Sequence, residues 1–136
     1  MPGSPFSWKV EVKGGKYGLK KARSLSIAPD NAFGLRVQGE AQKNRMGFFF
    51  LEADRSTEPI QRADILRNSI FKKMVGYLNS WDQGLFSENF AFKKARILFV
   101  TLSQKRIESM IKLNKKLDPS GQGYRLFLFA EGKRIA

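Results

Sequence analysis

The sequence predicts a mixed α/β domain in which helices cover a central sheet. Two runs, 47–53 and 95–102, are apolar on both faces, as is typical of strands buried on both sides. Two other stretches, 60–81 and 104–117, have apolar residues at the spacing of an amphipathic helix. Buried strands beside amphipathic helices indicate a sheet with helices packed against it.

The first part of the chain predicts strands. Residues 8–12 alternate between apolar and charged side chains, which favours an edge strand, and a basic, glycine-rich turn follows. Residues 25–30 and 32–37 alternate again on either side of Asn31, so we expect them to pair as a hairpin. The buried strand at 47–53 follows them.

The rest of the chain predicts two helices and two strands. Tyr77 and Trp81 extend the apolar stripe of the helix at 60–81, and Gly84 is expected to cap this helix. Trp8 and Trp81 are both expected to pack in the core or at its edge. Ser103 is the expected N-cap of the helix at 104–117, and a last strand covers 124–130. The predicted order is β-βββ-α-β-α-β, with about five strands in one mixed sheet flanked by two main helices.

Composition limits the chemistry. The 136 residues suit one domain over 1–136, with loose termini at 1–7 and 131–136, and 42% hydrophobic residues can form a core. The chain has no cysteine and no histidine, which excludes disulfides, thiolate or zinc–imidazole sites and histidine acid–base chemistry. No secretion signal or membrane-spanning run is recognisable, so we expect a cytoplasmic protein without a membrane partner.

The charge points to nucleic acid. A net charge of +13 and a pI near 10.3 are typical of a nucleic-acid-binding domain, although anionic lipid or acidic protein would also be attracted. Basic residues cluster at 13–23, 62–73, 93–96 and 105–116, and we expect the first two clusters to hold a DNA backbone. The expected nucleic-acid contacts are Lys20, Lys21, Arg23, Arg55, Thr57, Arg62, Lys72 and Lys73. Thr57 can alternatively cap the helix that follows it.

Three acids are candidate metal ligands. Asp30 ends a predicted hairpin strand, and Glu52 and Asp54 share one face of the central strand. Three carboxylates that converge there would suit Mg²⁺ or Mn²⁺, which can activate water and offset charge on a phosphate. The alternative is ordinary: Asp30 caps a turn, and the acid pair lies at a solvated strand end with Arg55 beside it.

The spacing of these acids resembles a known signature. Pro29-Asp30, then 21 residues, then Glu52-Ala53-Asp54 resembles the PD-(D/E)XK nuclease motif, and the strand order resembles the restriction-endonuclease-like fold of that superfamily. More specifically, the chain from about Trp8 to Leu117 is similar to the C-terminal domain of the replication-relaxation family of plasmids and mobile elements. Four segments carry this similarity: 29–35, 49–57 (FFLEADRST), 73–77, and 97–101 with Arg106-Ile107.

The resemblance implies roles for four residues, and the chain departs from the family pattern at two points. It implies that Asp30 and Glu52 bind the metal, that Asp54 assists and that Lys73 orients water or phosphate. The signature has a lysine two residues after the glutamate, where this chain has Asp54, so Lys72 or Lys73 is a candidate replacement unless both are solvated charges. Family members usually carry a winged-helix region before this domain, and 136 residues leave no room for one, so a separate winged-helix protein is a candidate partner.

Three functions remain open from the sequence. The first is a magnesium-dependent DNA endonuclease or nickase acting on double-stranded DNA. The second is a catalytically inactive DNA-binding module for plasmid replication or relaxation, and the third is an RNA-binding or protein-interaction adaptor of the same fold. A homodimer is a candidate assembly: Phe86, Phe90 and Phe92 would form either its interface or, as we favour, a cover for the sheet.

Overall fold

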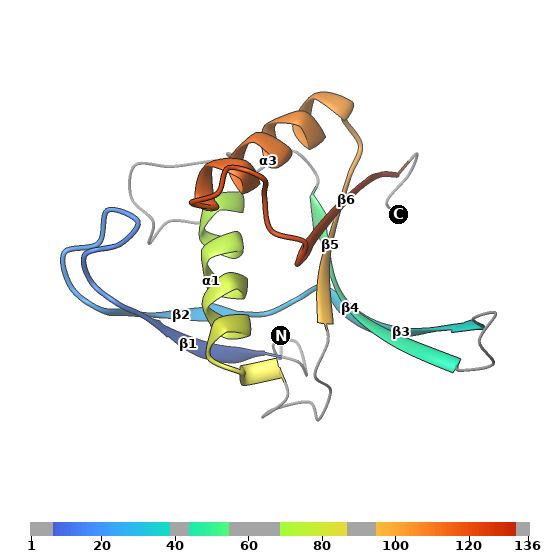
Figure 1. The fold of residues 1–136 in the computed structure, drawn as a ribbon, viewed down its shortest axis with the longest axis horizontal. Helices are drawn as coiled ribbons and strands as arrows, with labels where there is room; N and C mark the ends of the chain where they lie inside the picture. Colours follow the sequence, from blue (N-terminus) through green and yellow to red (C-terminus); the bar gives the residue numbers. More distant parts are fainter. Residues whose placement is uncertain (1–6, 39–43, 55–68, 87–94, 133–136) are drawn as a thin grey trace.

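The computed structural model describes residues 7–38, 44–54, 69–86 and 95–132 (Figure 1). Along the chain its elements are β1 (Trp8–Val12), β2 (Arg23–Ile27), β3 (Asn31–Gln38), β4 (Asn44–Asp54), α1 (Ile70–Asp82), β5 (Ala95–Thr101), α3 (Gln104–Leu117) and β6 (Phe127–Glu131). This order confirms the predicted succession of strands and helices. The C-terminal loose segment was placed too early, because Glu131 belongs to β6 and the N–H of Gly132 donates to the carbonyl of Thr101 at 2.9 Å.

The strands form two sheets rather than one sheet of about five strands. A four-stranded mixed sheet has the order β3-β4-β5-β6, in which β3 is antiparallel to β4 and the remaining pairs are parallel. β1 and β2 form a separate antiparallel pair.

The predicted hairpin between 25–30 and 32–37 is wrong, because β2 pairs with β1 and β3 pairs with β4. The reason lies in the buried faces. Val10 and Val12 of β1 and Leu25 and Ile27 of β2 are all buried, so these two short strands together present one apolar face to α1. The long β4 offers β3 a pairing partner along its whole length.

Helices α1 and α3 each begin at a serine cap. The hydroxyl of Ser69 accepts a hydrogen bond from the N–H of Lys72 at 3.1 Å, and Ser69 itself is extended, so α1 starts at Ile70 and is not continuous from residue 60. Residues 60–68 lie outside the described ranges. The bounds and the Ser103 cap of α3 agree with the prediction. Gly84, at a φ of 72°, donates to the carbonyl of Trp81 at 3.1 Å, which confirms its role in ending α1.

The core lies between the sheets and the helices. α1 packs on β1 and β2, α3 packs on β5 and β6, and the two helices contact each other. Trp8 packs against Phe50, Tyr77 and Phe86, and its indole N–H donates to Ser80 at 2.8 Å. Trp8 therefore packs as predicted. Trp81 does not: it is 51% exposed, because it lies on the last turn of α1 beyond the buried stripe.

Glycine allows the close approach of α1 to β2. A Cβ atom placed on Gly76 would lie 2.1 Å from Cδ1 of Ile27, far inside van der Waals contact. None of the helices in the described ranges is long and apolar enough to span a membrane.

Candidate functional site

Two of the predicted acids meet at one end of the sheet. The β3–β4 register pairs Asn31 with Leu51, so one step further Asp30 lies across from Glu52. The Asp30 carboxylate accepts a hydrogen bond from the N–H of Ala53 at 2.8 Å, and its own N–H donates to the carbonyl of Leu51 at 2.9 Å. Asp30 is exposed, whereas Glu52 is buried.

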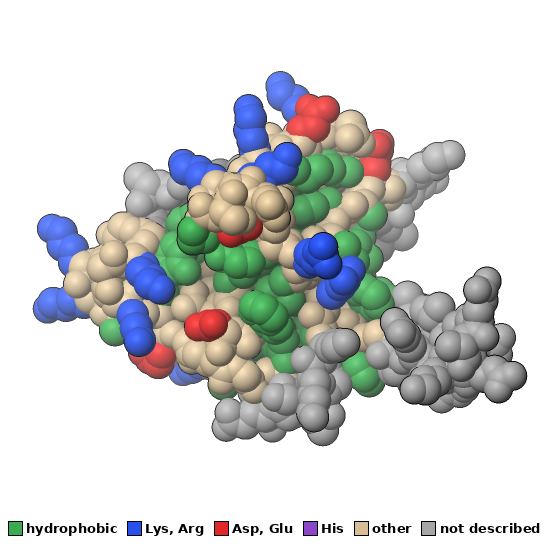
Figure 2. All heavy atoms as spheres, in the orientation of Figure 1, with side chains coloured by type: hydrophobic (Ala, Val, Ile, Leu, Met, Phe, Trp, Pro, Cys, Tyr) green, Lys and Arg blue, Asp and Glu red, His purple; other side chains and the backbone are tan. Residues whose placement is uncertain are grey.

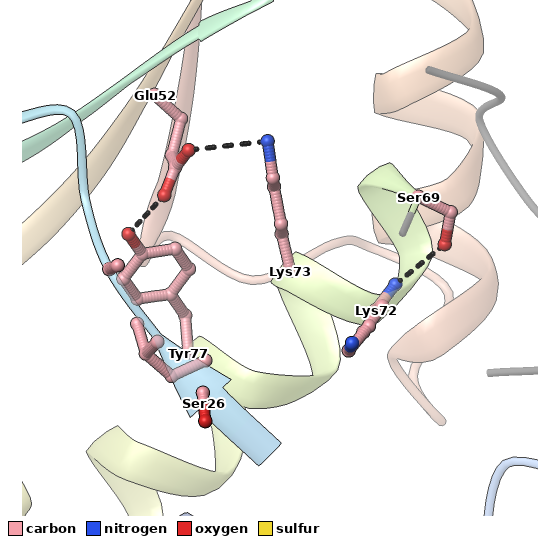
Figure 3. Close-up of a pocket in the computed structure, with 8 residues that line it drawn as sticks. Ser26, Glu52, Ser69, Lys72, Lys73 and Tyr77 are labelled. Carbon is pink, nitrogen blue, oxygen red and sulfur yellow. Dashed lines mark hydrogen bonds and ion pairs between the residues drawn. The ribbon is translucent and has the colours of Figure 1, made fainter. Parts of the chain in front are cut away.

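Glu52 has two side-chain partners on α1, as Figure 3 shows. The hydroxyl of Tyr77 donates to Oε2 at 2.5 Å, and Nζ of Lys73 lies 3.4 Å from Oε1. Residues four apart on a helix lie on the same face, so Lys73 and Tyr77 reach Glu52 from consecutive turns. One face of α1 therefore contacts both oxygens of the Glu52 carboxylate.

Burial controls the protonation of this group. Loss of solvent raises the pKa of Glu52 from 4.5 to about 7. Lys73 and the hydrogen bond from Tyr77 oppose this rise, and the charge of Asp30 adds to it. Burial, and then the negative charge of Glu52, raise the pKa of Tyr77 well above its ordinary value, so its hydroxyl remains a donor.

The Glu52 carboxylate faces a pocket of about 200 Å³ at the N-terminus of α1. Its lining includes Ser26, Ala28, Glu52, Ser69, Lys72, Lys73 and Tyr77. The positive end of a helix macrodipole and two lysines together favour an anionic group in such a pocket. The same pocket contains a carboxylate, so it combines features that suit a phosphate and a cation.

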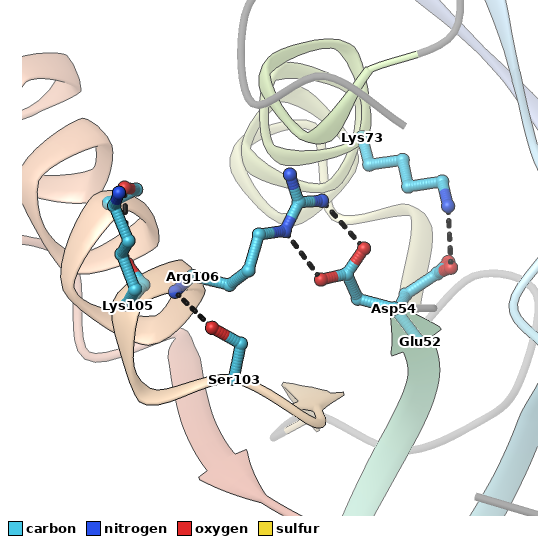
Figure 4. Close-up of polar contacts among 7 residues, drawn as sticks. Glu52, Asp54, Lys73, Ser103, Lys105 and Arg106 are labelled. Carbon is cyan, nitrogen blue, oxygen red and sulfur yellow. Dashed lines mark hydrogen bonds and ion pairs between the residues drawn. The ribbon is translucent and has the colours of Figure 1, made fainter. Parts of the chain in front are cut away.

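Asp54 is placed differently from Glu52 (Figure 4). Its two carboxylate oxygens accept hydrogen bonds from Nε and Nη2 of Arg106 at 2.9 and 2.7 Å, and both side chains are largely buried. This fork-to-fork pair holds the start of α3 against the end of β4. The structure therefore gives Asp54 a structural partner and does not leave it facing the Glu52 pocket.

The donor set can be judged for a divalent cation. In the described residues, no group of three or more acidic side chains is placed to hold a metal ion. Mg²⁺, however, is commonly bound by one or two carboxylates together with water and substrate phosphates. Asp30 and Glu52 fit that smaller donor set, and Asp54 does not belong to it.

The predicted DNA contacts are partly described. Lys20, Lys21 and Arg23 are exposed at the β1–β2 connection and the start of β2, and Figure 2 shows basic side chains projecting from this end of the molecule. Arg23 lies three residues before Ser26 of the pocket, which is about 10 Å along a strand. Lys72 and Lys73 line the pocket itself. Arg55, Thr57 and Arg62 lie outside the described residues.

The Phe-rich segment is described only at its start. Phe86 is buried against Trp8 and Phe50, which agrees with a role in covering the sheet. Phe90 and Phe92 lie outside the described residues.

The sequence interpretation missed two polar partners. Tyr77 is buried, as its place on the apolar stripe predicts, but its hydrogen bond to Glu52 was not expected, although residues four apart such as Lys73 and Tyr77 share one helix face. Arg106 was not expected to bind Asp54. In the structure β4 and β5 are parallel neighbours and Ser103 caps a helix directly after β5, so the first turn of that helix lies near the end of β4.

Comparison of the chain with protein-family models, with curated proteins and with solved structures gave no match.

Proposed function

We propose that the chain is a DNA-binding domain of restriction-endonuclease-like fold in which Asp30, Glu52 and Lys73 form a magnesium-dependent site that hydrolyses phosphodiester bonds. One observation carries this proposal: Nζ of Lys73 lies 3.4 Å from Glu52, at the sheet end where Asp30 binds the backbone of Ala53. The lysine expected at position 54 is thereby replaced by one from α1.

The arrangement of the strands supports the proposed fold. Asp30 immediately precedes β3, Glu52 is near the end of β4, and the antiparallel register brings them together across 21 intervening residues. The element order agrees with the resemblance to the replication-relaxation family. On that resemblance, we place the domain in replication or relaxation of a plasmid or other mobile element.

Each residue has a chemical task in this proposal. Asp30 and Glu52 would hold the cation, which when bound supplies an activated water and offsets charge on the scissile phosphate. Tyr77 fixes one oxygen of Glu52 and so orients the other oxygen toward Lys73. Lys73 presents its ammonium group to a phosphate oxygen, and Lys72 with the N-terminus of α1 attracts the phosphate into the pocket.

The exposed cluster of Lys20, Lys21 and Arg23 would hold the DNA backbone on one side of this pocket. Such contacts position a duplex without reading its sequence. The net charge of +13 supports a polyanionic ligand, because each neutralised phosphate releases a counterion.

A second candidate function is a catalytically inactive DNA-binding module of the same fold. The specific observation in its favour is Asp54, which occupies the signature's lysine position and is bound by Arg106. In this alternative Lys73 neutralises Glu52 for stability, and the basic surface alone carries the function.

Plasmid cleavage separates the two candidates. Supercoiled DNA is incubated with Mg²⁺ or Mn²⁺ and the protein, its Asp30→Asn and Glu52→Gln variants, and Glu131→Gln as an exposed carboxylate control. We expect nicked or linear DNA from the wild type and Glu131→Gln, and none from the other two. Cleavage that survives both site substitutions would contradict the proposed site.

A gel-shift measurement on the same samples completes the test. Retained DNA binding without cleavage by the wild type would favour the inactive module over the nuclease. A wild-type protein that neither cleaves nor binds DNA would contradict both candidate functions.

A further inference from the structure

We propose that Trp81, Arg96 and Arg125 form a second nucleic-acid site, which binds an unpaired nucleotide of single-stranded DNA by stacking its base on the indole and pairing its phosphate with the arginines. The choice of DNA as the ligand rests on the proposed function. The site itself lies at the opposite end of α1 from the Glu52 pocket.

Trp81 is the starting observation. It is 51% exposed, whereas the other tryptophan, Trp8, is half-buried and hydrogen-bonded to Ser80. Exposing so large an aromatic surface to water is unfavourable unless a ligand covers it. An exposed indole face suits a nucleobase, because bases of every sequence stack on aromatic side chains.

A cavity of about 380 Å³ adjoins the indole. It is lined by Trp81, Ala95, Arg96, Tyr124, Arg125 and Leu126. This volume lies in the range of small-ligand sites and can take one nucleotide. The cavity is formed where the end of α1 meets the starts of β5 and β6, and Figure 2 shows basic side chains beside hydrophobic ones over the β5–β6 part of this face.

The two arginines supply charge for a phosphate. Arg96 and Arg125 are both exposed, and neither forms an ion pair with a carboxylate in the part of the chain that the structure describes. A guanidinium group can bind a phosphate through two parallel hydrogen bonds. An aromatic face beside two exposed guanidinium groups therefore matches the base and the phosphate of one nucleotide.

The site is held in place before a ligand arrives. Asn114 of α3 accepts from the N–H of Tyr124 at 2.9 Å and donates to its carbonyl at 3.1 Å, which fixes the segment that carries Arg125. Asp118 accepts from the N–H of Gly123 at 2.9 Å and so closes the preceding loop. Less conformational entropy is then lost when a ligand binds.

Electrostatics distinguish two neighbouring cavities. Asp82 is exposed in a neighbouring cavity that Trp81 also lines, together with Lys16 and Tyr17, and the C-terminus of α1 adds partial negative charge there. The cavity with Asp82 thus combines one acid and one lysine, whereas the cavity with Arg96 and Arg125 has two arginines and no acid in its lining and is the one that favours a phosphate.

An unpaired strand fits this site better than a duplex. In a duplex both faces of each base are covered by stacking on neighbouring bases, so an indole can reach a base face only where the strand is single or frayed. Trp81 lies eight residues after Lys73 on α1, about 12 Å along the helix axis. DNA with a junction between paired and unpaired regions would engage both sites.

Binding of labelled dT12, followed by fluorescence anisotropy, tests the proposal against a 12-base-pair duplex. We expect Trp81→Leu to weaken dT12 binding about 5- to 100-fold and to leave duplex binding unchanged, while Trp81→Phe retains most of the affinity. Arg96→Gln with Arg125→Gln should lower the salt dependence of dT12 binding by about 0.7 per lost phosphate contact. Leu102→Ala, a change at another exposed apolar residue, serves as the control and should have no effect.

Two results would overturn the proposal. One is Trp81→Leu binding dT12 as tightly as the wild type. The other is a wild type that binds the duplex and cleaves plasmid but does not bind dT12, which would leave the proposed function intact. Conversely, Trp81-dependent binding of dT12 without duplex binding or cleavage would uphold this site and reject the proposed function.

Discussion

The ammonium nitrogen of Lys73 lies 3.4 Å from Oε1 of Glu52, so α1 brings a positive charge to the carboxylate at the end of β4. Glu52 is almost fully buried, whereas the Lys73 side chain is 29% exposed. Lys73 thus contacts the buried acid and also reaches the surface of the pocket, where a phosphate can approach it.

Stability should fall as pH rises toward neutrality. The folded protein holds a proton on Glu52 up to about pH 7, whereas the unfolded chain releases it near 4.5, so the folded state binds more protons between these values. The stabilising contribution of the protonated Glu52 to the free energy of unfolding is fully present below pH 4.5. It is lost as the pH rises from 4.5 through 7, and the loss is about 3 kcal/mol at most. Urea unfolding in EDTA at pH 5 and pH 8 measures the difference.

The Glu52→Gln variant isolates this effect. It cannot ionise, so we expect its free energy of unfolding to change much less between pH 5 and pH 8 and to exceed that of the wild type at pH 8. The chain has no histidine that would titrate in the same range. In Glu131→Gln the free energy of unfolding should depend on pH as it does in the wild type. The same pH dependence in Glu52→Gln would show that Glu52 is not its source.

The Asp54–Arg106 pair should be structural. Because both charges are largely buried, Arg106→Gln or Asp54→Asn alone should cost about 3–5 kcal/mol by leaving one partner unpaired. The double variant should lose less than the sum of the two. Urea unfolding measures these energies, and plasmid cleavage by the folded double variant should persist. Loss of cleavage in a stably folded double variant would show that Asp54 takes part in the cleavage reaction.

Gly76 and Ile27 should be energetically coupled. Alanine at position 76 would place its Cβ against Cδ1 of Ile27, and overpacking of this kind costs about 1–3 kcal/mol, which the better helix propensity of alanine offsets by about 1 kcal/mol. Ile27→Val removes Cδ1, so Gly76→Ala should be harmless in that background. A double-mutant cycle by urea unfolding checks this, and purely additive effects would show that the contact is absent.

The basic cluster at the β1–β2 end should dominate duplex binding. Reversing charge at Lys20, Lys21 and Arg23 should weaken binding at low salt and reduce the salt slope by about 0.9 for each lost phosphate contact. Lys112, Lys115 and Lys116 are exposed on α3, and their reversal changes the net charge equally. Equal losses from the two triple variants in anisotropy titrations would show that net charge, and not this surface, binds DNA.

Periodicity predicted the elements better than their pairing. Ser103 and the amphipathic stretch after it predicted both ends of α3 correctly, because capping and apolar spacing are local properties of the sequence. Strand pairing is not local. The alternation in β2 was equally compatible with β1 and β3 as partners, and only the shared buried face against α1 selects β1.

The candidate site was likewise predictable only where it depends on neighbouring strands and not on how the helices dock. Asp30 and Glu52 could be expected to meet, because a short connection between strands constrains their register. The partners of the acids come from helices whose rotation and docking depend on tertiary packing. Tyr77 is buried in the core, as its place on the apolar stripe indicates, but its hydrogen bond to Glu52 was not predicted, and Trp81, one turn later, is exposed.

The rate of plasmid cleavage by Lys73→Gln tests the central claim most directly. Lys105 is exposed on the first turn of α3 and does not line the Glu52 pocket, so Lys105→Gln is the matched loss of one charge. With Mg²⁺ or Mn²⁺ present, we expect Lys73→Gln to bind duplex DNA but to lose cleavage, while Lys105→Gln cleaves as the wild type does. Undiminished cleavage by a folded Lys73→Gln protein would contradict the account.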